Sequence, residues 1–335
     1  MALVASAGCW LWGCGDSASS TGDTAGSSSQ AGETSVAGDP GLSNGGAHAH
    51  AGSTGALAGR AGAAGAPPGG APGAAGSTSA GSSNGGAGAG GGAPAMSAGC
   101  GKAAPLSVAS QQTVMIDSAV RSYLLVPPTP YDGNTPYPVV FAYHGSGGSG
   151  ANFRAGVSFE AAADNQAIFV YPDGAGGIWD LKNNGSDAKL FDSIMSSLTA
   201  NWCVDSGAVF AIGFSYGGWA ATQMARARPA AMRAVVSIEG GGPQGASNSD
   251  PAVAAMIIHG TNDTAEPLTA GQNSRDHFLQ INGCGSTSSA TSPAPCVAYA
   301  GCQPKKPVVW CQHEGGHEIP AFTASAIWSF FSGVR

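Results

Sequence analysis

A serine lies in the pentapeptide Gly-Phe-Ser-Tyr-Gly at residues 213–217, between an apolar run and a stretch with helical character. The apolar run covers residues 208–212 and predicts a strand, whereas residues 219–228 predict a helix. Glycines two positions before and after the serine allow the sharp strand-to-helix turn that exposes a hydroxyl at a helix N-terminus. Ser215 is therefore the candidate nucleophile, and attack on a carbonyl carbon is the chemistry that this position would support.

A serine hydroxyl is a good nucleophile at neutral pH only when a histidine takes its proton and a carboxylate orients that histidine. In α/β-hydrolases these residues follow one another in the order serine, acid, histidine. Asp263 comes shortly after the apolar run 255–258, and His317 comes after the run 308–310. We interpret Ser215, Asp263 and His317 as a catalytic triad of nucleophile, acid and base.

Other ionisable residues near the same strand ends are alternatives for two of these roles. Glu266 lies three residues beyond Asp263 and farther from the strand end, which favours Asp263 as the acid. His259 and His313 also lie at strand ends, where a histidine more often bonds the backbone. Two glycines directly before His317 suit a loop that folds this histidine back over the site.

The tetrahedral intermediate of acyl transfer needs two N–H donors, which form an oxyanion hole. We expect one from Tyr216, after the nucleophile, and the other from Ser146, in the loop after an earlier strand. The glycines at 145–150 do not form a phosphate loop, because no Lys-Ser or Lys-Thr pair follows. For Trp179 and Trp219 two roles stay open, packing in the core or contacting substrate as part of an aryl-binding wall.

Strands and helices alternate along the chain, and the candidate residues follow strands directly. This rhythm predicts an α/β-hydrolase fold, with a mostly parallel central sheet, helices on both faces and active residues at the C-terminal ends of strands. Strands are expected over residues 121–126, 139–143, 167–171, 208–212, 234–238, 255–259 and 308–312, and helices over 187–202, 219–228, 270–281 and 321–331.

The composition changes sharply near residue 100, which divides the chain into three parts. Residues 1–14 are interpreted as the remnant of a secretory or lipoprotein signal. The Leu-Trp-Gly-Cys sequence ending at Cys14 resembles a lipobox whose cysteine is acylated, Cys9 is a poorer candidate, and an ordinary cleaved signal is the alternative. Residues 15–99 have too little apolar surface to offset the entropy of ordering and predict a disordered linker. Residues 100–335 form the expected catalytic domain.

Six cysteines remain in the catalytic domain, and no Cys-x-x-Cys pair indicates zinc. An even number in an exported chain predicts three disulfides, with fifteen possible connectivities. Cys296 and Cys311 flank a turn-rich segment at 301–307 and can face each other across a hairpin.

The charge of the chain limits its partners. A net charge of −7 with only 13 lysines and arginines argues against nucleic acid and favours a neutral or mildly polar substrate. The apolar N-terminal stretch is too short to cross a bilayer, so any membrane contact is expected through a lipid anchor alone. We expect a monomer that needs no metal and no organic cofactor.

Eight short motifs spread over the catalytic domain resemble those of secreted feruloyl esterases and the related polyhydroxybutyrate depolymerase-like esterases. The resemblance implies Ser215 as nucleophile, Asp263 as acid and His317 as base. It also implies the disulfides Cys100–Cys203 and Cys284–Cys302, which leaves Cys296 to pair with Cys311. The motifs are Gly-Cys-Gly-Lys at 99–102, Tyr-Pro-Asp-Gly at 171–174, Gly-Phe-Ser-Tyr-Gly-Gly at 213–218, His-Gly-Thr-Asn-Asp at 259–263, Asn-Gly-Cys at 282–284, Tyr-Ala-Gly-Cys at 299–302, Pro-Val-Val-Trp at 307–310 and Gly-Gly-His at 315–317.

The expected activity is that of a secreted or surface-anchored bacterial lipoprotein that releases hydroxycinnamates, such as ferulate, from plant cell-wall polysaccharide. Polyhydroxyalkanoate depolymerase and acetylxylan esterase are alternatives with the same chemistry. A non-catalytic surface binding protein on a hydrolase scaffold is an alternative of another class. Glu-Ile-Pro at 318–320 departs from the tryptophan or threonine that often follows the histidine in similar enzymes, which leaves the substrate edge of the pocket open.

Overall fold

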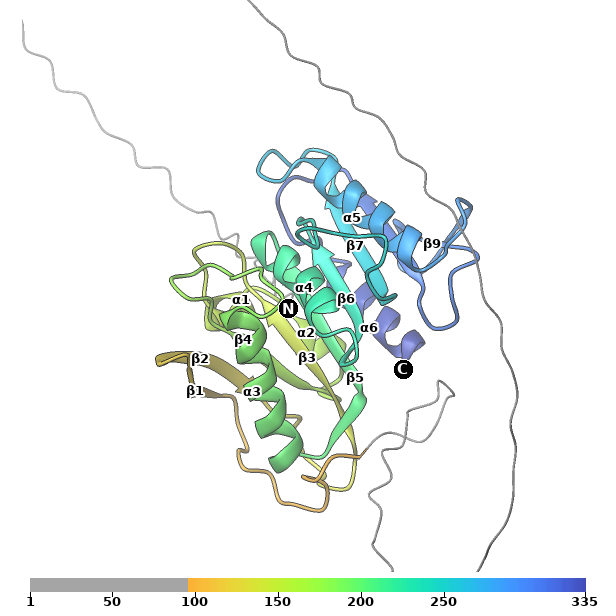
Figure 1. Cartoon of the computed structure of the whole chain (residues 1–335). Coiled ribbons are helices and arrows are strands. Elements are labelled where there is room, and N and C mark those ends of the chain that lie inside the picture. Colours follow the sequence, from red (N-terminus) through yellow and green to blue (C-terminus); the bar gives the residue numbers. More distant parts are fainter. Residues whose placement is uncertain (1–95) are drawn as a thin grey trace, which may run out of the picture. The chain divides into compact units, whose positions relative to one another are not determined.

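The computed structural model describes residues 96–335 (Figure 1). The expected signal at 1–14, the acylation candidate Cys14 and nearly all of the expected linker at 15–99 lie outside the described residues. No helix among residues 96–335 has the length and apolar character needed to cross a membrane.

Ten strands form a single sheet in the order β1-β2-β4-β3-β5-β6-β7-β10-β9-β8. The six central strands, from β4 to β10 in this order, run parallel, and antiparallel strands extend both edges. The strands are β1 (Ser110–Ile116), β2 (Ala119–Val126), β3 (Tyr137–Tyr143), β4 (Ile168–Pro172), β5 (Val204–Phe214), β6 (Met232–Ile238), β7 (Ala254–Gly260), β8 (Ser288–Ala290), β9 (Cys296–Tyr299) and β10 (Val308–His313).

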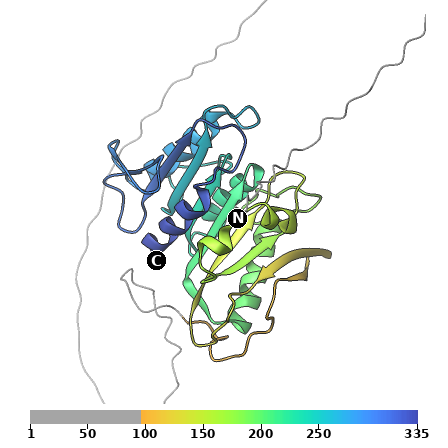
Figure 2. The ribbon, with the colours of Figure 1, turned by 180° about the vertical axis from the view of Figure 1, so that it is seen from behind.

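Helices cover both faces of the sheet. Figure 1 shows α3 (Ser186–Asn201), α4 (Tyr216–Ala227) and α5 (Leu268–Ile281) on one face. The view from behind in Figure 2 shows α6 (Thr323–Val334) across the other face. The short helices α1 (Gly150–Ala155) and α2 (Phe159–Ala162) contribute Phe153 and Phe159 to the core on the side of α6.

Each central strand supplies the core on both faces, which explains its continuous apolar sequence. In β3, Val139 and Phe141 belong to the core under α3 and α4, whereas Val140 and Ala142 belong to the core under α6. These four side chains have no exposed surface. The side chains of a strand alternate between the faces of a sheet, so a run of consecutive apolar residues is what two covered faces require.

The predicted α/β-hydrolase architecture is confirmed, and every strand and helix expected from the sequence is present with somewhat shifted ends. The elements that the prediction lacked are the edge strands β1 and β8, the strand β9 next to β8, and the short helices α1 and α2. Residues of β1 alternate between half-buried and exposed up to its buried last residue, and all three residues of β8 are exposed. Edge strands therefore lack the apolar run by which the central strands can be recognised.

Three disulfides link the described cysteines, and they are the pairs that the family resemblance implies: Cys100–Cys203, Cys284–Cys302 and Cys296–Cys311. Cys296 lies directly opposite Cys311 in the antiparallel pair of β9 and β10, as the hairpin argument predicted. Disulfides at this density are typical of proteins that fold outside a reducing cytosol.

Candidate active site

The serine lies between β5, which ends at Phe214, and α4, which begins at Tyr216. Its backbone has φ 56° and ψ −125°, a conformation that L-residues rarely adopt and that costs about 1–3 kcal/mol. The fold holds it there, because the Ser215 amide donates to the Ile238 carbonyl at 2.8 Å and the Ser215 carbonyl accepts from the Gly218 amide at 2.8 Å. The turn is thus the strained elbow that the pentapeptide predicts.

The glycines of the pentapeptide are required by close backbone contacts. A Cβ atom at Gly213 would lie 1.8 Å from the Gly217 carbonyl oxygen, and one at Gly217 would lie 2.1 Å from the Tyr143 carbonyl oxygen. Both distances are far below a van der Waals contact. Any other residue at these positions would displace the helix from the sheet and move the serine.

The candidate acid and the candidate base form a direct hydrogen bond. Asp263 follows β7 and His317 follows β10, and the His317 Nδ1–H donates to Asp263 Oδ2 at 2.7 Å. The second carboxylate oxygen, Oδ1, accepts the backbone amides of Ala265 at 2.8 Å and Glu266 at 2.9 Å. Because the carboxylate accepts the Nδ1 hydrogen, a neutral His317 keeps its lone pair on Nε2, the atom that must take the serine proton.

Hydrogen bonds keep the candidate acid ionised. Burial raises the pKa of Asp263, but the hydrogen bonds from His317 and from the amides of Glu266 and Ala265 outweigh this effect, so that its pKa lies below the ordinary value. A charged carboxylate at neutral pH is what a histidine needs when it becomes an imidazolium during catalysis.

The base lies next to the nucleophile turn. The His317 ring is centred 4.9 Å from the ring of Phe214, the residue before the serine. The Nε2 atom of His317 has no hydrogen-bond partner within residues 96–335, which leaves it available to the serine hydroxyl or a substrate. The strand order places β5, β7 and β10 in the same parallel region, so their C-terminal ends bring the three candidate residues to one edge of the sheet.

The segments that carry the two predicted oxyanion donors both adjoin the serine, since Tyr216 follows it in the chain and Ser146 lies in a neighbouring loop. A Cβ atom at Gly145 would lie 3.4 Å from Ser215 Cβ, so the loop that carries Ser146 packs directly against the nucleophile turn. The Gly147 amide fixes this loop by donating to the Gly177 carbonyl at 2.8 Å. The backbone amides of Ser146 and Tyr216 have no partner within residues 96–335 and remain free to bind an oxyanion.

The prediction of a substrate-contacting Trp179 is not supported. Only 3% of this residue is exposed, its indole N–H donates to the His144 carbonyl at 2.8 Å, and its ring lies 5.1 Å from that of Tyr143. Trp179 therefore packs beneath the loop that carries Ser146. Tyr216, beside the nucleophile, is half-buried and donates its hydroxyl to the Trp179 carbonyl at 3.1 Å. Trp219 is half-buried, and a role in substrate contact stays a prediction.

The remaining histidines at strand ends bond other groups. His144 donates from Nδ1 to the Gly145 carbonyl at 2.7 Å and accepts the Gly174 amide at Nε2 at 3.0 Å, which fixes one neutral tautomer. Burial lowers the pKa of His144 accordingly. His259 donates from Nε2 to the Glu266 carbonyl at 3.0 Å. Neither histidine faces the candidate nucleophile as a base.

Sequence reasoning missed Glu239, which is completely buried behind the candidate acid. It directly follows β6, its Oε1 lies 2.6 Å from His313 Nε2, and its Oε2 accepts the Gly260 amide at 2.8 Å. Burial, opposed by the Gly260 hydrogen bond and reinforced by the nearby Asp263, raises the pKa of Glu239 to about 8. The signal was an acidic residue at the end of the apolar run 234–238, the position at which the other candidate residues were found.

Glu239, His259 and Asp263 also place ligand-type atoms within 4.8 Å of one another. Because His259 Nε2 carries the hydrogen that it donates to Glu266, its lone pair is on Nδ1. That atom packs against the backbone of Gly271, where an added Cβ would lie 2.5 Å away. The lone pair is thus turned towards helix α5, and the group does not fit a metal ion.

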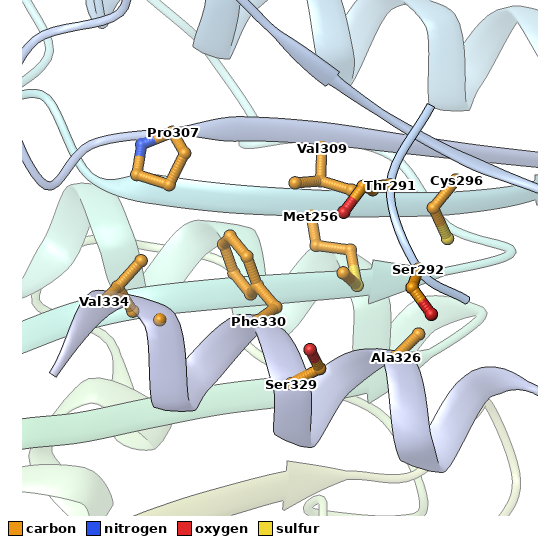
Figure 3. Close-up of a pocket in the computed structure, with 11 residues that line it drawn as sticks. Met256, Thr291, Ser292, Cys296, Pro307, Val309, Ala326, Ser329, Phe330 and Val334 are labelled. Carbon is orange, nitrogen blue, oxygen red and sulfur yellow. The ribbon is translucent and has the colours of Figure 1, made fainter. Parts of the chain in front are cut away.

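A cavity of about 160 Å³ with a mixed apolar and hydroxyl lining lies elsewhere, between β7, β10, α6 and residues 291–296 (Figure 3). Met256, Val309 and Phe330 line it, and none of its lining residues has a side chain that titrates. It opens at the surface, where Ser292, Ser329 and Gly333 are exposed, and contains none of the candidate catalytic residues.

Comparisons with known proteins identify the family. The chain is 32% identical over 265 residues to feruloyl esterase D of Neurospora crassa, covering 72% of this chain and 91% of that protein. It is 34% identical over 254 residues to feruloyl esterase C of Emericella nidulans, covering 71% of this chain and 91% of that protein. The chain belongs to the feruloyl esterase family. The family resemblance stated from the motifs is thereby confirmed, although no family model matches the sequence.

Solved structures agree on the fold of this feruloyl esterase family member. An acetyl xylan esterase from Aspergillus awamori is similar with a TM-score of 0.56 at 17% identity, covering 68% of this chain and all of that one. A mutant feruloyl esterase module from Clostridium thermocellum, complexed with sinapinate, has a TM-score of 0.52 at 14% identity, covering 70% of this chain and 93% of that one. At these identities the likeness supports the α/β-hydrolase fold alone.

Proposed function

We propose that this protein is a serine carboxylic-ester hydrolase that releases hydroxycinnamates, such as ferulate, from esters of plant cell-wall polysaccharide. The observation that carries the proposal is the 2.7 Å hydrogen bond between His317 and Asp263 beside the strained turn of Ser215. Its support from relatives is the 32% identity to a feruloyl esterase over most of the described chain.

In the proposed acylation step, Ser215 Oγ attacks the ester carbonyl carbon while its proton passes to His317 Nε2. Asp263 accepts the Nδ1–H and stabilises the positive charge that the imidazole acquires. The carbonyl oxygen becomes an oxyanion, which the amides of Ser146 and Tyr216 bind. The tetrahedral intermediate then expels the sugar alcohol, which takes the proton from His317, and the hydroxycinnamoyl group stays on the serine.

Deacylation repeats these steps with water. His317 removes a proton from a water molecule, the resulting hydroxide attacks the acyl-serine, and the same two amides bind the second oxyanion. Collapse of this intermediate returns the proton to Ser215 Oγ and releases the carboxylic acid. Each step uses side chains and amides of this chain together with water.

The test of the proposed substrate is a comparison of esters with the full chain. Hydrolysis of methyl ferulate, an acetyl ester and a short polyhydroxybutyrate oligomer is measured side by side. A kcat/KM for methyl ferulate well above the others supports the proposal. A preference for the acetyl ester or the oligomer keeps the catalytic residues but overturns the substrate, and no turnover of any ester favours a binding protein.

We further propose that the catalytic domain, residues 100–335, is exported and tethered by the linker at 15–99. The three disulfides support export. A lipid anchor on Cys14 rests on the sequence alone. Mass spectrometry of the mature N-terminus, from protein made in a bacterial host, tests the anchor. Cys14→Ser is the variant and Cys9→Ser its control. Acylation that persists in Cys14→Ser contradicts an anchor on Cys14.

A further inference from the structure

Glu239 lies in a buried hydrogen-bond network whose donors and acceptors can be assigned. The Gly315 amide donates to His313 Nδ1 at 3.1 Å, so the lone pair of that imidazole is on Nδ1. His313 Nε2 therefore carries the hydrogen and donates it to Glu239 Oε1 at 2.6 Å. Glu239 Oε2 accepts the Gly260 amide at 2.8 Å. The network leaves one position open, on the side of Asp263.

Two buried carboxyl groups meet at that position. His259 Nε2 lies 3.9 Å from Glu239 Oε2 and 3.8 Å from Asp263 Oδ2, so both groups lie against the same imidazole. Neither group has exposed side-chain surface. A carboxyl oxygen of Glu239 and one of Asp263 lie within 4.8 Å of each other. Ionisation of both groups at this separation in a buried site is costly, so one of them keeps its proton. Asp263 accepts three other hydrogen bonds and stays charged, whereas Glu239 accepts only two from the described residues.

We propose that Glu239 is a positioning residue of the active site, whose protonated carboxyl group donates a hydrogen bond to the Asp263 carboxylate. The inference rests on the proposed function, since it explains how the acid of the triad is held. Asp263 then receives hydrogen bonds from His317, from two backbone amides and from Glu239, and these donors fix its orientation towards the histidine.

Burial and the neighbouring acidic groups favour the protonated form of Glu239, and the hydrogen bond from the Gly260 amide opposes it. Asp263 and Glu318 are acidic and disfavour a second negative charge. His313, on β10, has a pKa lowered by burial and is a neutral donor. His259, on β7, donates its Nε2–H to a carbonyl and gives Glu239 no short contact. Within the described chain the only cationic-type side chains within 4 Å of Glu239 are these two histidines.

The arrangement predicts a loss of activity on the alkaline side. With a pKa of about 8, Glu239 releases its proton as the pH rises through that value. Asp263 then loses a donor and faces a like charge in a buried site, so its orientation towards His317 is disturbed. A glutamine at this position still offers an N–H to Asp263 but has no proton to lose.

The experiment compares kcat for methyl ferulate from pH 6 to pH 10 in the wild type, Glu239→Gln and Glu314→Gln. Glu314 is exposed in the same loop as His317 and serves as the matched control. We expect the wild type and Glu314→Gln to lose activity above about pH 8. Glu239→Gln is expected to retain at least about a tenth of the activity at pH 7 and to lack this fall. An unchanged alkaline fall in Glu239→Gln overturns the inference.

A measurement on the wild type tests the inference even if Glu239→Gln does not fold. The carboxyl carbons of ¹³C-labelled glutamates are followed by NMR from pH 4 to pH 10. One glutamate that titrates near pH 8 supports the inference, and the absence of any glutamate titrating above about pH 6 overturns it. A wild type that hydrolyses no ester at any pH refutes the proposed function instead, and the NMR titration still decides the protonation of Glu239.

Discussion

A buried ion pair joins Arg121 on β2 to Asp187 in the first turn of α3. Removal of this pair would test how the scaffold supports the candidate active site. Arg121 Nη2 lies 2.5 Å from Asp187 Oδ1, and the two residues are only 5% and 3% exposed. Arg121 also donates to the Asp173 carbonyl at 2.8 Å, and Asp187 Oδ2 accepts the Asp180 amide at 2.5 Å. The pair thus anchors both ends of the loop that carries Trp179, which packs beneath the loop of Ser146.

We expect Asp187→Asn to destabilise the protein strongly. Arg121 cannot lose its proton, so the variant leaves a buried charge without a counter-charge. Removal of one partner from a buried pair costs about 3–5 kcal/mol. In a domain of this size each kcal/mol lowers Tm by about 2–4 °C, so the expected decrease is about 6–20 °C. The loosened loop is also expected to lower kcat for ester hydrolysis.

The assay is chemical and thermal unfolding of the full chain at pH 7, with Asp117→Asn as the control. Asp117 and Lys189 form a pair of the same 2.5 Å length with side chains that are 56% and 47% exposed. Loss of such an exposed pair costs about 0–1 kcal/mol. The double variant Arg121→Met with Asp187→Leu removes both charges and is expected to recover part of the loss, because the Asp173 carbonyl and the Asp180 amide still lose their partners. Equal losses in Asp187→Asn and Asp117→Asn would refute this reasoning.

Two further predictions concern the elbow and the buried acid. Gly217→Ala is expected to abolish ester hydrolysis and to cost at least about 1–3 kcal/mol, because its Cβ would lie 2.1 Å from the Tyr143 carbonyl oxygen. Gly333→Ala, whose Cβ meets nothing within 4 Å, is expected to be neutral or stabilising by up to about 1 kcal/mol, and equal unfolding midpoints for these variants would contradict the clash. Glu239 ionises near pH 4.5 in the unfolded chain but only near pH 8 in the fold, so the unfolded state binds fewer protons between these values. The unfolding free energy of the wild type should therefore decrease as pH rises through this window, by up to about 1.4 kcal/mol per pH unit from this group. Glu239→Gln should lack this component in urea unfolding at pH 5 to 8, and parallel pH curves for both proteins would count against it.

The sequence was sufficient for the central sheet and for the residues proposed to do the chemistry. Strands covered on both faces must be apolar at consecutive positions, so β3, β6 and β7 are visible as continuous runs. Chemistry in such folds follows the C-terminal ends of these runs, and the short segments after the strands contain Ser215, Asp263 and His317. The glycines of the elbow identify only the serine, because they are required by the backbone contacts of its own turn.

The network behind the acid needed the order of strands in space. The network joins three neighbouring strands of the sheet, β6, β7 and β10. Glu239 follows β6, Asp263 follows β7, and His313 is the last residue of β10. β10 comes after β8 and β9 in the chain, and nothing in the chain order says that it returns to β7. The burial of Trp179 could not be predicted from the sequence either. A tryptophan in a glycine-rich loop is expected to be exposed, and only the structure shows that its indole N–H bonds the His144 carbonyl.

The proposed mechanism requires Ser215 to be the nucleophile of an ester hydrolase, and a substitution of this serine tests that role. Release of ferulate from methyl ferulate is measured for the wild type and for Ser215→Ala, with unfolding midpoints recorded for both. We expect that the wild type hydrolyses methyl ferulate and that Ser215→Ala keeps its fold but loses at least about 10³-fold in kcat. A folded Ser215→Ala protein that hydrolyses methyl ferulate at the wild-type rate would contradict it.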